Sequence, residues 1–114
     1  MRIAVACQGL TVAPYFVQCT GYTCYMVERG IIIDSRSMPA FDQPIEKLVE
    51  VLKSVQIDVL IVGLIEYDMA AYFCRNDIEI VAGAEGNALD VAKAYLSNTL
   101  AGVDNVCKIG DYKD

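Results

Sequence analysis

The sequence contains no histidine, and this absence removes several kinds of active site. A Ser-His or Cys-His pair for nucleophilic catalysis needs an imidazole, and no GxSxG motif is present either. The phosphate-binding patterns GxGxxG and GxxxxGKS/T are also absent, which argues against a nucleotide site. We therefore expect a protein that is not an enzyme, and imidazole cannot ligate any metal that it holds.

Basic residues are scarce relative to acidic ones. Nine Lys and Arg side chains stand against fifteen Asp and Glu side chains, which gives a formal net charge of -6 at pH 7. A chain of this charge repels phosphate backbones. We expect no nucleic-acid partner.

Long apolar runs are missing as well. The longest, from Val59 to Ile65, is far below the roughly 20 residues that span a bilayer. The apolar stretch after Arg2 is shorter than the roughly 7 to 15 residues of a secretory signal. These features predict a cytoplasmic protein that has no membrane partner.

Five cysteines are present at irregular spacings, without a CxxC pair, so a disulfide framework is not expected. The chain has 114 residues, of which 55% are hydrophobic and 21% charged, as is usual for one compact domain. We expect this domain to cover residues 1–101. The sequence after Gly102 shows no period, which predicts an irregular tail over residues 102–114.

Apolar patterning predicts five strands and three helices, with a loop at 10–19 that is longer than most. Asp42, Gln43 and Pro44 supply the start of the first helix. The strands are expected at 3–7, 20–28, 30–37, 57–62 and 78–81, and the helices at 44–54, 65–74 and 88–96.

This order of elements predicts a single α/β domain. The strands at 20–28 and 30–37 form an antiparallel hairpin, whereas helices separate the strands at 3–7, 57–62 and 78–81. Right-handed crossovers then make the strands at 3–7, 57–62 and 78–81 parallel to one another. The expected fold is a five-stranded mixed sheet, in the order 3-2-1-4-5, with helices on both faces.

Several segments resemble one known family. They are MRIAVA at 1–6, PYF at 14–16, DVLIVG at 58–63, IVAGAEGNA at 80–88 and AKAYL at 92–96. Together they look like the dinitrogenase iron-molybdenum cofactor biosynthesis family, which includes the NifX- and NifY-like proteins and the carboxyl-terminal domain of NifB. The resemblance covers about residues 1–101, and residues 83–96 are its most specific part.

The resemblance implies a ribonuclease-H-like fold and a non-catalytic accessory or carrier domain for an iron-sulfur or molybdenum-containing cluster. Cluster-assembly proteins are then the expected partners. A nuclease of that topology needs a carboxylate on its first strand, and residues 2–7 contain none. The alternative is a small-ligand-binding or regulatory protein-interaction module without a cluster.

Ligands of open α/β sheets bind beyond the carboxyl ends of the parallel strands, which selects the loops after residues 7, 62 and 82. Thiolates are soft ligands, so Cys7 and Cys19 are the candidate metal ligands at this end. By the resemblance, Tyr15 stands where the family has a histidine. The candidate groove is lined by Cys7, Gln8, Gly9, Tyr15, Cys19 and Gly63.

Each of these residues also has a structural interpretation. Free cysteine is among the most buried residue types, so Cys7 fits a tight strand without any ligand. Gly83 and Gly86 precede a helix whose first N–H groups suit an anion, but glycines at such turns also serve backbone geometry. Both interpretations stay open from the sequence.

Ile31, Ile32 and Ile33 would cover both faces of an edge strand. Pairing with the same strand of a second copy would protect them, and so would packing against a helix. The sequence leaves a monomer and a homodimer open.

Overall fold

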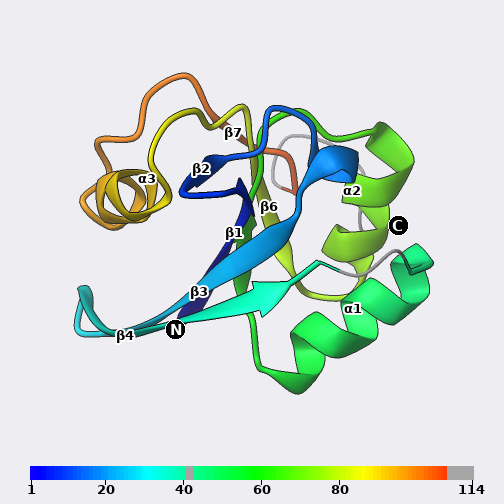
Figure 1. Ribbon diagram of the computed structural model, residues 1–114, viewed down its shortest axis with the longest axis horizontal. Coiled ribbons are helices and arrows are strands. Elements are labelled where there is room, and N and C mark those ends of the chain that lie inside the picture. The colour runs from blue at the N-terminus through cyan, green and yellow to red at the C-terminus, as the bar shows by residue number, and fades with distance from the viewer. Residues whose placement is uncertain (41–42, 108–114) are drawn as a thin grey trace.

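Strand β1 occupies the middle of an open mixed sheet that has helices on both faces (Figure 1). The structure is a computed structural model, and it describes residues 1–40 and 43–107. The strands are β1 (Arg2–Gln8), β2 (Thr11–Val12), β3 (Gly21–Glu28), β4 (Ile31–Pro39), β5 (Val59–Ile61), β6 (Glu79–Ala82) and β7 (Asp104–Asn105). The helices are η1 (Phe16–Gln18), α1 (Ile45–Ser54), α2 (Tyr67–Arg75) and α3 (Ala88–Leu96).

The strand order is β4-β3-β1-β5-β6-β7, and β2 pairs with β1 outside this path. β1 runs parallel to β5 and antiparallel to β3, while β5 and β6 are parallel. This confirms the predicted order of the five main strands and the antiparallel hairpin. The predicted strand number is wrong, because β2 and β7 bring the sheet to seven strands.

Successive side chains of β1 point alternately into two apolar cores, one on each face of the sheet. Ala4 and Ala6 face α1 and α2, whereas Ile3, Val5 and Cys7 face α3. The small alanines leave room for aromatic side chains, and Phe16 meets Phe73 edge to face with ring centroids 5.7 Å apart. Because β1 is buried on both faces, its sequence is a continuous apolar run.

The loop expected at 10–19 contains the short strand β2 and the 3-10 helix η1. Within the segment 102–114, β7 pairs with β6 through Val81 and Asn105. Two-residue strands carry no measurable period, so the sequence could not reveal them. Residues 108–114 of the expected tail and Asp42 of the expected helix start lie outside the described residues.

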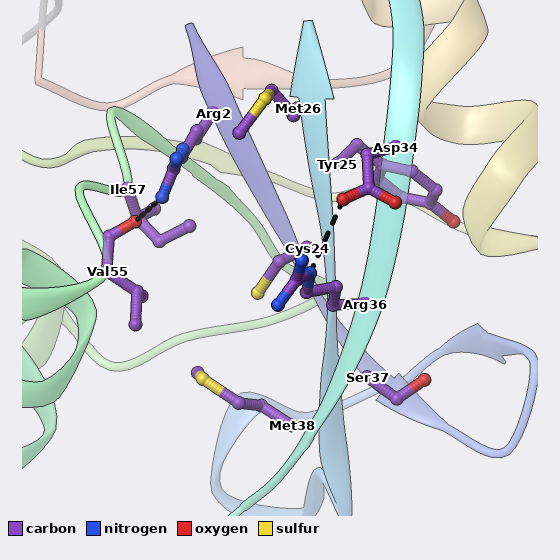
Figure 2. A pocket seen from close by; sticks show the side chains of 10 residues that line it. All are labelled: Arg2, Cys24, Tyr25, Met26, Asp34, Arg36, Ser37, Met38, Val55 and Ile57. Carbon is purple, nitrogen blue, oxygen red and sulfur yellow. Dashed lines mark hydrogen bonds and ion pairs between the residues drawn. The ribbon is translucent and has the colours of Figure 1, made fainter.

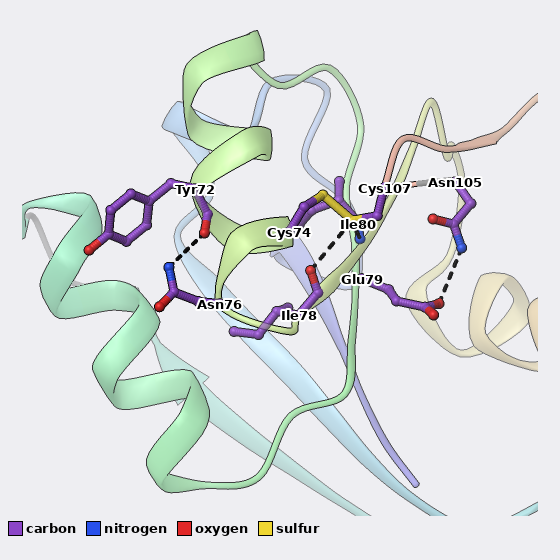
Figure 3. The surroundings of a disulfide bond; sticks show 8 residues. All are labelled: Tyr72, Cys74, Asn76, Ile78, Glu79, Ile80, Asn105 and Cys107. Atoms are coloured by element: carbon purple, nitrogen blue, oxygen red, sulfur yellow. Dashed lines mark hydrogen bonds between the residues drawn. A yellow bond between two sulfur atoms is a disulfide. The ribbon is translucent and has the colours of Figure 1, made fainter. Parts of the chain in front are cut away.

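Cys74 and Cys107 form a disulfide, whereas the cysteine spacing predicts no disulfide framework (Figure 3). Cys74 lies near the end of α2, and pairing of β7 with β6 brings Cys107 beside it. The backbone N–H of Ile80 also donates a hydrogen bond to the Cys107 sulfur, at 3.3 Å. The two cysteines are 33 residues apart, so only the tertiary fold brings them together.

Among the described residues, no helix has both the length and the apolar character needed to cross a membrane.

Removal of the disulfide should destabilise the protein. In the loop-entropy account, a bridge that closes 33 residues is worth roughly 3 to 4 kcal/mol. We expect Cys107→Ala to lower the free energy of unfolding by about that amount in urea titrations, with the Cys24→Ala variant as the control. Alkylation of the denatured wild type should label the three free cysteines before reduction and all five after it. Labelling of all five without a reductant would contradict the bridge.

Candidate functional site

The loops after β1 and β5 meet at the carboxyl end of the sheet, as the topology predicts, but they are bonded to each other. The N–H of Leu64 donates to the Pro14 carbonyl at 2.8 Å, and the N–H of Phe16 donates to the Leu64 carbonyl at 2.8 Å. Tyr15 and Leu64 form an isolated parallel bridge. The crevice that sequence reasoning placed between these loops is therefore occupied by the protein's own backbone.

A second set of bonds ties the same loop to the start of α3. The N–H of Val12 donates to the Gly86 carbonyl at 2.8 Å, and the N–H of Ala88 donates to the Leu10 carbonyl at 2.9 Å. The Asn87 side chain accepts the N–H groups of Leu89 and Asp90, at 3.0 and 3.2 Å. Because these amides already have acceptors, the arrangement favours the structural interpretation of Gly86 over an anion site.

Gly63 and Gly83 serve close packing of the backbone. A Cβ atom on Gly63 would lie 2.6 Å from the Pro14 carbonyl oxygen, and one on Gly83 would lie 2.8 Å from the Gly102 oxygen. Side chains do not tolerate such distances, so both positions exclude any larger residue. Gly9 differs, since a Cβ atom there would have no other atom within 4 Å. Its φ of +63° suits the turn between β1 and β2.

The Cys7 thiol points into the core on the α3 side of the sheet. It is 2% exposed, donates to the Val5 carbonyl at 3.3 Å and lies 3.7 Å from the Thr23 hydroxyl oxygen. Gln8 lies next to it at the exposed end of β1, and its side chain donates to the Gln18 carbonyl at 3.1 Å. This placement favours the structural interpretation of Cys7, a small buried hydrophobe, over a ligand.

Cys19 is half-buried and packs on the other side of the sheet, against the core beneath α1 and α2. The structure thus places Cys7 and Cys19 on opposite faces and does not bring them together as a ligand pair. Alternation along β1 fixes the face of Cys7, but Cys19 follows η1, where no period indicates a direction.

Cys19 lines a cavity of about 520 Å³ between η1, β3 and the first turns of α1 and α2. This volume is typical of small-molecule sites. Sequence reasoning selected none of the other residues here, because they come from four elements that only the fold brings together. The lining residues are Phe16, Val17, Cys19, Thr20, Tyr22, Ala40, Gln43, Leu48 and Met69.

Burial raises the pKa of the Cys19 thiol above 9.0, its ordinary value, although a hydrogen bond from the Tyr22 hydroxyl opposes this rise. The Cys7 thiol adds a smaller upward effect on the same pKa. Burial likewise raises the pKa of Tyr22, so its hydroxyl keeps its proton and remains a donor. The cavity therefore offers a protonated thiol at neutral pH, and Met69 adds a second sulfur.

A second cavity, of about 370 Å³, lies at the opposite end of the sheet between the β3–β4 hairpin and the residues that follow α1 (Figure 2). Its charged groups are already engaged. The Arg2 guanidinium donates to the Val55 carbonyl at 2.9 Å, and Arg36 pairs with Asp34 at 3.3 Å. Cys24 lines this cavity and is about as buried as Cys19, which makes it a matched control for the Cys19 site.

No three His, Cys, Asp or Glu side chains in the described part of the chain come together as a possible metal site.

Searches of known sequences and of solved structures gave different outcomes. No protein-family model matches the chain. No curated protein matches it by sequence. Solved structures do match over nearly the full length.

PH0822 matches with a TM-score of 0.82 at 19% identity, covering 100% of this chain and 99% of that one. A candidate dinitrogenase from Methanocaldococcus jannaschii matches with a TM-score of 0.73 at 16% identity, covering 92% and 96%. A candidate NifB protein from Thermotoga matches with a TM-score of 0.70 at 14% identity, covering 96% of each chain. These likenesses establish the fold. Two of the three names agree with the family that the sequence resembles.

Substitution of Gly63 tests how closely the loop after β5 approaches the Pro14 carbonyl. We expect Gly63→Ala to lower the free energy of unfolding by about 1–3 kcal/mol, because the new methyl group would overlap the Pro14 carbonyl. Gly9→Ala is the matched control, since its cost comes from backbone conformation alone. Equal urea midpoints for Gly63→Ala and the wild type would disprove the close approach.

The reactivity of Cys19 should follow its raised pKa. The thiolate is the reactive form, so iodoacetamide should modify Cys19 more slowly at pH 8 than it modifies an unstructured cysteine peptide. The rate should keep rising above pH 9, where the peptide rate levels off. Mass spectrometry after digestion assigns the label to each cysteine. A plateau for Cys19 below pH 9 would show that burial does not raise its pKa.

Proposed function

We propose that this protein is a non-catalytic accessory protein of metal-cofactor assembly, which carries an iron-sulfur or molybdenum-containing cluster as cargo in the Cys19 cavity. We also propose that the fold is ribonuclease-H-like. The names of two structural neighbours, a candidate dinitrogenase and a candidate NifB protein, support a role related to cofactor biosynthesis.

One observation carries the choice of cavity. Of the three free thiols, only Cys19 is partly accessible and also lines a cavity at the carboxyl end of the sheet. Cys7 borders a smaller cavity of about 300 Å³ but is only 2% exposed, and Cys24 lies in the cavity at the other end. Soft sulfur donors suit iron-sulfur and copper- or molybdenum-containing cargo, and the cavity presents both Cys19 and Met69.

The remaining lining residues suit a cargo that is released again. Phe16 and Leu48 give the cavity an apolar wall, which shields a cluster from water without bonding to it. The Tyr22 hydroxyl donates to Cys19 and so supports this thiol as a ligand, whereas the Thr20 hydroxyl donates to the Cys7 carbonyl at 3.4 Å. A single thiolate leaves most positions of a cluster open, and this favours transfer over permanent retention. The absence of histidine and of nucleophile motifs supports a non-catalytic role.

Anaerobic titration with iron and sulfide, or with tetrathiomolybdate, tests this proposal. We expect a visible absorption band and bound metal in elemental analysis of the wild type. Cys19→Ser should weaken binding by at least about tenfold, the loss that follows even from changes around metal ligands. Binding should strengthen as pH rises, because ligation displaces the thiol proton.

Two matched variants serve as controls for the titration. Cys24→Ser and Cys7→Ser should bind as the wild type does, because neither thiol lines the proposed cavity. Equal binding by Cys19→Ser and the wild type would show that the cavity is wrong. If the wild type binds neither reagent, the carrier proposal fails and the alternative of an interaction module takes its place.

A further inference from the structure

Exposed apolar side chains gather at the carboxyl end of the sheet. Of the nine large apolar side chains that are exposed in the described part of the chain, six lie on the loops and helix starts at this end. Their exposed fractions range from 40% for Leu89 to 80% for Leu10. We call these six residues the rim surface: Leu10, Tyr15, Val17, Leu64, Tyr67 and Leu89.

Backbone contacts bring residues of the rim surface together in two places at the carboxyl end of the sheet. The bridge between Tyr15 and Leu64 places those two residues side by side. The bond from Ala88 to the Leu10 carbonyl brings Leu10 next to the first turn of α3, where Leu89 lies. Apolar patches of this kind on folded proteins mark interaction sites, whereas single exposed apolar residues do not.

Exposed acidic side chains lie in the same segments as the rim surface. Glu66, Asp68, Glu85 and Asp90 are all exposed in the same loops and helix starts. The segments 8–20, 62–68 and 83–90 contain no Lys or Arg. The charged side chains within these three segments are therefore all acidic.

This charge pattern decides between possible occupants. A second copy of the chain, docked rim to rim, would bring two sets of four carboxylates together, which is repulsive. We propose that the rim surface docks a protein partner whose own surface presents apolar side chains flanked by lysine or arginine. Opposite charges then steer the encounter, and apolar burial supplies most of the affinity.

Backbone hydrogen bonds tie one segment of the rim surface to its neighbours in the free protein. The segment 10–16 is held by backbone bonds from Val12 to Gly86, from Ala88 to Leu10 and from Phe16 to Leu64. A surface that is ordered in the free protein loses little conformational entropy on binding. Docking itself is independent of the proposed cargo. Val17 also lines the Cys19 cavity, so a docked partner would lie beside the cargo, and only this last link rests on the proposed function.

A designed peptide tests the docking surface without any cluster. The probe is an amphipathic helix of leucine and lysine, and its binding is measured by fluorescence anisotropy at about 0.15 M salt. The controls are the same pattern with glutamate in place of lysine, and a peptide of equal charge with serine in place of leucine. We expect the leucine-lysine peptide to bind and both controls to bind at least about tenfold more weakly.

Variants localise the binding. Leu10→Ser combined with Leu64→Ser should weaken it about tenfold, whereas Ile31→Ser with Ile33→Ser, which changes two similarly exposed side chains of β4, should leave it unchanged. Glu66→Gln with Glu85→Gln should weaken it several-fold, and Glu28→Gln with Glu46→Gln should not. Two results would overturn the proposal: equal losses of affinity in the rim and control variants, or equal binding of the leucine-lysine and serine-lysine peptides. Either would show that the overall charge of -6 alone attracts the peptide.

Discussion

Burial of β1 on both faces is the constraint on which the rest of the structure depends. Residues 3–6 have no exposed surface, and the strand bonds to β3 along one edge and to β5 along the other. With both edges and both faces used, β1 fixes which side chains enter each core and where the layers lie. The hairpin and the crossover units are therefore both placed relative to this one strand.

The same constraint shapes the candidate functional end. The loop that leaves β1 is bonded to the loop after β5 and to the start of α3, so the N–H groups of Val12 and Phe16 already have acceptors. Recognition at this end then falls to side chains: a thiol and a thioether inside the cavity, and apolar and acidic groups along the rim surface. A phosphate-binding sheet of similar topology would instead keep those N–H groups free.

Much of the fold could be predicted because its main elements have strong local patterns. The predicted range of α3 equals the observed one, since Asn87 caps it and its apolar residues recur at helical spacing. β2, β7 and the Cys74–Cys107 bridge depend on pairings between distant residues, and no local pattern reports them. The candidate site was predicted only in part. Cys19 was identified, but Tyr22 and Met69 enter the cavity from elements whose packing the sequence does not specify.

The disulfide turns part of the sheet into a closed covalent ring. Residues 74–107 form this ring, and it contains the whole of β6 and α3. The segment between Cys74 and Cys107 has no free end, because the bridge ties Cys107 to α2. α3 can therefore leave the sheet only as a loop anchored at both ends. A single protease cut within the ring would leave both fragments joined, so the α3 layer would stay attached to the molecule after nicking.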